Sequence, residues 1–318
     1  MPRPSEVHVN KTLENISVAY LQETTEFVCP QVFPIVPVMK DSDTYFKFDT
    51  GDLLRDNMQV RPPSTPSAGA DYDLTTDTYS CNRYALKQAI DWQTRANQDG
   101  ELVTDSVVTK ILTQKALIKF ERYFASQYFT TSVWTGSTTA GDITAGTKWD
   151  AGSSTPIADV EAQRLSVRNS CGMKPNVMVV SSAVHSALKN NSDILGRLGG
   201  NERGVPTEQI MAALFEVDKY IVADVTYNSA NKGATDVIAP VFGTDGVLLT
   251  YAATEPNIMS PSGGYIFASK QFASNDWGLI VRKWQDINIT SDIIEVEFKL
   301  DPKVVTPKAG AFFTKVLT

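Results

Sequence analysis

An apolar pattern between Leu102 and Phe129 constrains the fold more than any other feature of the sequence. The apolar side chains recur at spacings of three and four residues, at Val107, Val108, Ile111, Leu112, Ala116, Ile118, Tyr123 and Phe124. This periodicity is typical of a helix with one buried face, and no Pro or Gly interrupts it. At 1.5 Å per residue, about 28 residues span roughly 40 Å. We therefore expect a helix that crosses the whole molecule.

A polar linker, TGSTTAGDITAGTKWDAGSST at residues 135–155, separates this helix from a region of different character. After it, Thr155 and Pro156 suit the N-cap and first residue of a helix that ends at Gly172. The continuous apolar run VMVVS at 177–181 is typical of a strand buried on both faces. Further helices and strands alternate up to residue 270, which predicts an α/β unit. Within it, residues 241–251 predict a hairpin with its turn at Asp245-Gly246.

The last fifty residues predict antiparallel strands. Between residues 294 and 301, apolar side chains alternate with charged ones, which predicts a strand with one wet face. Residues 277–281 repeat the alternation. Residues 83–97, by contrast, have some helical periodicity and predict a helix that is broken after Asn97.

The stretch RPPSTPSAGADYD, residues 61–73, predicts an unusually long hairpin. Residues 45–48 before it and alternate residues from Tyr72 to Thr78 after it are typical of strands. The stretch between them has almost nothing to bury. Pro62, Pro63 and Pro66 limit the conformations of an exposed turn. They also lack amide donors, so the strand edge is less able to pair with a wrong strand. We expect this stretch to be ordered by a partner rather than by its own chain.

The N-terminal forty residues resemble an arm. In FVCPQVFPIVPVM, residues 27–39, Pro30, Pro34 and Pro37 exclude a continuous helix and a central strand. An extended apolar strip remains, which packs either on the chain's own core or on a neighbouring subunit. The sequence leaves both alternatives open.

Composition limits the classes of function. The chain has 318 residues, enough for one large α+β domain with insertions or for two domains. Its net charge of −7 argues against a basic surface that wraps nucleic acid, but not against a shell that encloses it. Cys29, Cys81 and Cys171 are few and scattered, which favours free thiols in a reducing compartment. Neither a signal peptide nor a membrane span is expected.

No motif predicts catalysis. The sequence has no GxSxG, HExxH, GxGxxG or EF-hand pattern, and GDITAGTK at 141–148 departs from a phosphate loop. Cys171 and His185 have no visible third group that would make them a nucleophilic pair. The two His and three Cys match no zinc spacing. The sequence therefore predicts no catalytic, cofactor or metal site, and a protein that is not an enzyme.

The order of these elements, together with the text of residues 148–195, resembles the major capsid proteins of tailed bacteriophages. Their fold is shared with encapsulin shells and herpesvirus capsid floors. The positions that carry the resemblance form a Trp, a Pro-capped helix and a G-x-x-P-N-x-x-V-x-S segment: Trp149, Pro156, Gly172, Pro175, Asn176, Val179 and Ser181.

The resemblance implies an α+β capsid fold with five consecutive parts. These are an N-terminal arm (1–40), an extended hairpin loop (41–81), a peripheral domain with a spine helix at about 102–130 (82–155), an α/β axial domain (156–270), and closing strands of the peripheral domain (271–318). Arm and loop would reach over neighbouring subunits. The expected intersubunit contacts are Phe33, Ile35, Val36, Tyr45, Phe46, Phe48, Arg61, Pro62, Pro63, Pro66 and Tyr72.

The function implied is a subunit that forms hexamers and pentamers of an icosahedral shell around the double-stranded DNA of a tailed phage. Its expected partners are itself, a separate scaffolding protein, a portal, a decoration protein and, without specificity, the packaged DNA. It would be assembled in the host cytoplasm and reside in the virion capsid. Two alternatives are an encapsulin-like cellular shell protein and an uncharacterised α/β enzyme. The hairpin separates shell from enzyme, because an enzyme has little use for an unsupported projection.

Overall fold

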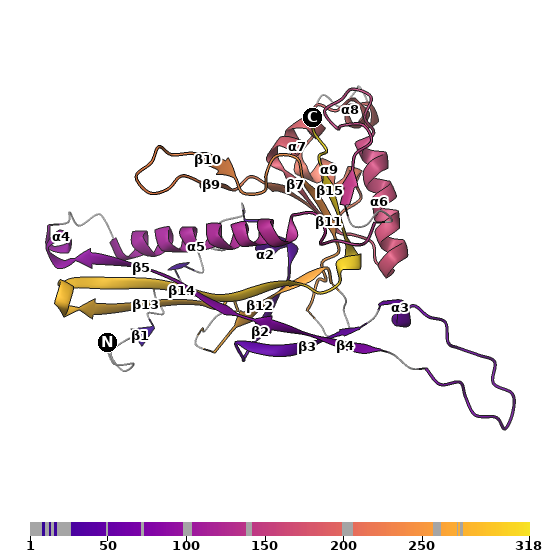
Figure 1. Ribbon diagram of the computed structural model, residues 1–318, viewed down its shortest axis with the longest axis horizontal. Coiled ribbons are helices and arrows are strands. Elements are labelled where there is room, and N and C mark those ends of the chain that lie inside the picture. The colour runs from indigo at the N-terminus through magenta and orange to yellow at the C-terminus, as the bar shows by residue number, and fades with distance from the viewer. Residues whose placement is uncertain are drawn as a thin grey trace.

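Two β-sheets and one long helix form the body of the protein (Figure 1). The computed structural model describes residues 8–9, 13, 16–17, 27–48, 50–70, 73–97, 104–137, 142–198, 206–256, 262–271, 273 and 276–318. The most extensive sheet has the order β1-β13-β14-β12-β2, and β5 also pairs with β14. Its strands are β1 (His8–Val9), β2 (Ile35–Val38), β5 (Asn82–Asp91), β12 (Gly264–Ser269), β13 (Leu279–Asp286) and β14 (Ser291–Val304).

Helix α5, Thr104–Tyr128, packs along this sheet and lies within the range that the periodicity predicts. Its 25 residues make it far longer than the average helix of about 11–12 residues. The ring of Phe120 on α5 meets Tyr84 of β5 at 5.6 Å and Phe298 of β14 at 5.3 Å, both edge to face. These aromatic contacts join the helix to two strands more than two hundred residues apart in the chain.

The second sheet has the order β6-β15-β11-β7-β8 and forms a separate lobe with the helices that follow the linker (Figure 1). Its strands are β6 (Asp142–Thr144), β7 (Val177–Ser181), β8 (Lys219–Ala223), β11 (Val247–Thr250) and β15 (Gly310–Thr314). The helices are α6 (Pro156–Cys171), α7 (Ser182–Lys189), α8 (Ser192–Arg197) and α9 (Glu208–Leu214). The run VMVVS is buried along its whole length as β7, which confirms the predicted doubly covered strand.

Helix α6 begins and ends where the sequence predicts. Pro156 is its first residue, and Gly172 ends it with φ 77°, in the left-handed region that suits glycine. Thr155 occupies the N-cap position, but its side chain makes no capping hydrogen bond. The cap signal therefore placed the helix correctly, although the expected side-chain contact does not form.

The predicted helix over 83–97 is wrong for most of its length. Residues 82–91 form β5, which pairs with β14 from Asn82 opposite Leu300 to Asp91 opposite Ser291. Only α4, Trp92–Ala96, is helical, and the Asp91 carboxylate accepts hydrogen bonds from the Gln93 and Thr94 amides at its start. A ladder of ten backbone pairs overrides a weak local periodicity.

Three strands pair differently from what the predicted hairpin and the predicted domain boundaries imply. β11 is not one arm of a hairpin over 241–251, because β7 and β15 flank it on both sides. β12 falls inside the range expected for the α/β unit but pairs with β14 of the first sheet. β15 falls among the expected closing strands but pairs with β11 and β6 of the second sheet. Strand pairing over long sequence distances decides each of these assignments.

The wet face predicted for residues 294–301 is also wrong. Glu297, Lys299 and Asp301 are buried. Arg83 and Arg282 both pair with the Glu297 carboxylate, and the Lys299 ammonium lies 3.0 Å from the Asp41 carboxylate. Buried charges of this kind are tolerated because each has an opposite charge beside it.

The predicted hairpin is present. β3, Ser42–Phe48, pairs with β4, Leu74–Ser80, over seven residues from Ser42 opposite Ser80 to Phe48 opposite Leu74. A four-residue helix, α3 (Thr50–Leu53), follows β3, and residues 55–62 beyond it have no helix or strand. In Figure 1 the segment between α3 and β4 extends well away from both sheets, at the lower right.

Candidate intersubunit surfaces

The tip of the β3–β4 loop is held only by local contacts among the described residues. The Arg61 Nε donates to the Thr65 carbonyl at 2.6 Å, and the Thr65 hydroxyl donates to the Pro62 carbonyl at 2.7 Å. Ser64 has φ 64°, which closes the turn. Arg61, Pro62, Pro63 and Pro66, four of the expected intersubunit contacts, are all exposed. They form a small preformed turn that packs on no core.

Three apolar side chains of this loop were not among the expected contacts. Leu54 is 63% exposed, Met58 92% and Val60 96%. Exposed apolar groups of this size, together on one projecting segment, are typical of a surface that a partner covers. The stretch RDNMQV, residues 55–60 just before the prolines, contains Met58 and Val60 and is the sequence signal that could have identified them.

The expected contacts on β3 differ in their surroundings. Phe46 is 53% exposed, whereas Tyr45 is half-buried against Phe267 of β12, with ring centroids 5.1 Å apart. The Tyr45 hydroxyl also donates to the Asp77 carboxylate at 3.4 Å. Phe48 lies in the ladder of β3, but its side chain and all of Tyr72 fall outside the described residues. Of the β3 side chains that the structure describes, Phe46 has the most apolar surface available to a neighbour.

Phe33 belongs to the chain's own core, so its expected role as an intersubunit contact is wrong. Its side chain is 1% exposed. The centroid of its ring lies 5.1, 5.7 and 6.3 Å from the ring centroids of Phe124, Tyr128 and Trp134. Phe124 and Tyr128 lie on α5 and Trp134 lies in the segment that follows it, so two of the three contacts anchor the strip to the long helix.

Ile35 and Val36 lie on β2, which pairs in parallel with β12 at the end of the sheet. Ile35 packs partly on the main core, and Val36 packs partly on the cluster around Tyr79 and Phe267. Pro37 lacks an amide donor, and the edge position of β2 tolerates this. Between the two alternatives left open for residues 27–39, the structure therefore favours the chain's own core, except at Met39, which is 77% exposed.

A buried carboxyl group joins this N-terminal strip to α5. The amide of Cys29, the first residue of α2 (Cys29–Val32), donates to Glu121 Oε1 at 2.8 Å. Glu121 is almost completely buried, and apolar side chains such as Leu117, Phe298 and Ile266 line the small cavity beside it. Burial raises the pKa of Glu121 to about 8, although the hydrogen bonds from the Cys29 and Val28 amides oppose the shift.

Replacing Glu121 by Gln is expected to remove a pH dependence of stability. Between its unfolded pKa of about 4.3 and about 8, the folded chain keeps a proton that the unfolded chain releases. The free energy of unfolding therefore falls as pH rises through this window, by up to about 1.4 kcal/mol per pH unit. Glu121→Gln keeps an oxygen that accepts the Cys29 amide but does not titrate.

Chemical denaturation between pH 4 and 9 measures this effect. We expect the variant to match the wild type at the acidic end and to exceed it at the alkaline end. Glu161→Gln, an exposed change on α6, is the matched control and should leave the wild-type profile unaltered. Identical pH profiles for Glu121→Gln and the wild type would show that Glu121 is ionised in the folded chain.

The candidate nucleophilic groups do not form a catalytic pair. The Cys171 thiol donates to the Val167 carbonyl at 3.1 Å, and burial raises its pKa. His185 Nδ1 lies 2.9 Å from the Tyr220 hydroxyl, and burial lowers the pKa of the imidazole. A raised thiol pKa is the opposite of what nucleophilic catalysis requires. These two side chains are parts of separate packing clusters.

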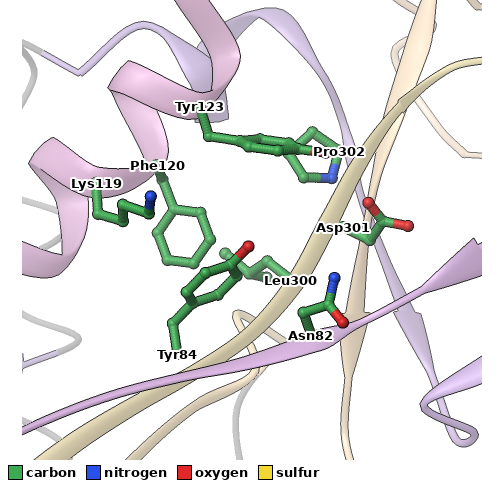
Figure 2. A pocket seen from close by; sticks show the side chains of 8 residues that line it. All are labelled: Asn82, Tyr84, Lys119, Phe120, Tyr123, Leu300, Asp301 and Pro302. Atoms are coloured by element: carbon green, nitrogen blue, oxygen red, sulfur yellow. The ribbon is translucent and has the colours of Figure 1, made fainter. Parts of the chain in front are cut away.

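Other binding functions find little support in the described part of the chain. No group of three or more His, Cys, Asp or Glu side chains there is placed to hold a metal ion. No described helix combines the length and apolar character that a membrane span requires. Figure 2 shows a small pocket between α5, β5 and β14, lined by Asn82, Tyr84, Lys119, Phe120, Tyr123, Leu300, Asp301 and Pro302. Its volume of about 10 Å³ is at the lower limit for a single water molecule.

Comparison with known proteins places this fold among viral shell proteins. No family model matches the chain. A phage-related protein from Bordetella bronchiseptica superposes with a TM-score of 0.76 at 20% identity, covering 98% of both chains. The mature capsid of bacteriophage PhiM1 matches with a TM-score of 0.53 at 12% identity, over 88% of this chain and 84% of that one.

The comparison of amino-acid sequences gives a relative with a named role. A major capsid protein, from Burkholderia phage BcepMu, is 21% identical over 267 residues, which are 82% of this chain and 84% of that protein. These likenesses confirm the predicted resemblance to the major capsid proteins of tailed phages and the α+β capsid fold. They support a structural role in the virion capsid and not an enzymatic one.

Proposed function

We propose that the chain assembles as hexamers and pentamers into an icosahedral shell that encloses the double-stranded DNA of a tailed phage. The projecting β3–β4 loop is the observation that carries this proposal. Leu54, Met58 and Val60 leave most of their surface uncovered by the described chain, and each apolar Å² that a neighbour buries contributes about 25 cal/mol. Many such modest contacts, repeated around a closed shell, add up to a stable assembly.

The proposal assigns a part of the capsid subunit to each region of the chain. The first sheet and α5 correspond to the peripheral domain, and the lobe built on β7, β8, β11 and β15 corresponds to the axial domain at the hexamer and pentamer centres. Residues 1–40 correspond to the arm, of which residues 27–38 pack on the chain's own core, and residues 41–81 correspond to the extended loop. The separation of the chain into two sheets supports this division, with β12 and β15 reassigned as the pairing requires.

The same proposal includes a separate scaffolding protein, a portal and a decoration protein as partners, and assembly in the host cytoplasm. The resemblance to phage capsid proteins is the support for these partners. Contact with packaged DNA is non-specific, because the chain's net charge of −7 argues against tight wrapping by a basic surface.

Negative-stain electron microscopy of the purified chain, alone and with its scaffolding protein, tests the proposal. Uniform closed shells or hexameric rings are the expected result. A persistent compact monomer under every condition would refute it. The content of the particles separates the two kinds of shell: genomic DNA supports a phage capsid, whereas a cargo enzyme supports an encapsulin-like compartment.

A further inference from the structure

The charge of α5 differs in sign from that of the rest of the protein. The helix has four basic residues, Lys110, Lys115, Lys119 and Arg122, and two acidic ones, Asp105 and Glu121. Its formal charge is therefore 4 − 2 = +2, while the whole chain has 29 − 36 = −7, which leaves −9 for the remainder.

Neither acid of α5 offsets the basic residues at the surface. Asp105 forms ion pairs with Arg95 and Lys283, and Glu121 is buried. The solvent-facing charge of the helix is therefore entirely positive.

Three of the basic residues share one strip of the helix surface. Lys115, Lys119 and Arg122 follow one another at spacings of four and three residues, so they lie on the same side of α5 within about 10 Å along its axis. All three are exposed. None of them forms an ion pair with a carboxylate of the described residues.

Two tyrosines from other elements border this strip. The Arg122 guanidinium lies over the ring of Tyr227, 4.3 Å from its centroid, and Tyr227 belongs to β9 (Thr226–Asn228), which pairs with β10 (Ile238–Pro240). The Lys119 ammonium lies 5.8 Å from the ring centroid of Tyr84 on β5, and both side chains line the pocket in Figure 2. Such contacts hold a cation in place without neutralising it.

We propose that the α5 basic face, defined as Lys115, Lys119, Arg122, Tyr84 and Tyr227, contacts the phosphate backbone of the enclosed double-stranded DNA. The inference rests on the proposed function, because it requires a shell that contains DNA. Lys, Arg and Tyr are side chains that contact phosphates and fix a protein on a duplex without reading its sequence. The contact is therefore electrostatic and independent of sequence.

A protein partner fits this face less well. The cores of protein–protein interfaces are depleted in Lys, and two unpaired ammonium groups would lose their hydration there without compensation. The chain is negative overall but concentrates positive charge on one helix. Contact with DNA is therefore expected at the α5 basic face rather than over the whole surface.

Binding of a short fluorescent DNA duplex by the purified subunit, measured by anisotropy as a function of salt, tests the inference. Each phosphate neutralised contributes about 0.9 to the slope of log affinity against log salt. The variant Lys115→Gln/Lys119→Gln/Arg122→Gln is expected to reduce that slope by about two to three. Lys115→Arg/Lys119→Arg keeps the charge and should keep the wild-type slope.

The matched control removes three exposed lysines elsewhere, by Lys87→Gln, Lys174→Gln and Lys308→Gln. It lowers the net charge by the same amount and is expected to reduce the slope by less than one. Thermal unfolding of each variant checks that the subunit is folded. We expect every variant to be folded, because all the substituted positions are exposed.

Three outcomes would overturn the inference. The first is an unchanged salt slope in the triple variant, and the second is no salt-dependent binding by the wild type at low salt. The third is a triple variant that binds DNA normally but no longer assembles, which would assign the face to a neighbouring subunit. Failure of the proposed function would look different, since the wild type would then form no shells or rings whatever its affinity for DNA.

Discussion

Deleting residues 61–70 is expected to leave a folded subunit that no longer assembles into closed shells. The described residues of this tip contact one another through Arg61, Pro62 and Thr65, and they contribute nothing to either sheet. The deletion shortens the loop between α3 and β4 by half, which changes its closure entropy by only about 0.6 kcal/mol. Thermal unfolding of the subunit and electron microscopy of assembly reactions measure the two effects separately.

A replacement of the same ten residues by Gly and Ser is the matched control for the deletion. It restores the length of the loop but removes Pro62, Pro63 and Pro66, which limit the conformations lost on docking. We expect assembly to be partly recovered, at a higher protein concentration than the wild type needs. A deletion variant that is unfolded would show that the loop is part of the subunit core.

Replacing Phe33 by Ala is expected to destabilise the isolated subunit by about 3–5 kcal/mol, the usual cost of truncating a buried aromatic side chain. The cavity would open between Phe124, Tyr128 and Trp134, all of which contact the ring. The Phe33 ring also lies directly against Gly264, which has no side chain to fill the space that the ring would leave. Urea denaturation of the subunit, far from assembly conditions, measures the loss.

Phe46→Ala is the matched control for Phe33→Ala, since it removes the same ring from an exposed position. We expect it to leave the free energy of unfolding within about 0.5 kcal/mol of the wild type and to weaken assembly. If Phe33→Ala proved neutral in the isolated subunit and harmful only to assembly, the strip at residues 27–39 would belong to a neighbouring subunit.

Part of the candidate interface could be predicted from sequence. Three prolines between two alternating stretches indicated a projecting turn, and Arg61, Pro62, Pro63 and Pro66 are exposed there. Phe33 was assigned to the interface because an apolar residue in a proline-rich strip has the same local pattern whether its own chain or a neighbour buries it. Glu121 could not be found either, because burial of a single carboxyl group leaves no periodic signal.

The sequence by itself determined the elements whose pattern is local. A period of three to four residues placed α5, a proline and a glycine bounded α6, and an unbroken apolar run marked β7. Only the tertiary structure decided which sheet each strand joins and that residues 82–91 are a strand. β5 pairs with residues two hundred or more positions away. β12 joins the first sheet although it falls in the range of the α/β unit, and β15 joins the second sheet although it falls among the closing strands. Backbone hydrogen bonds carry no side-chain signature, so the pairing partner cannot be read from the residues that pair.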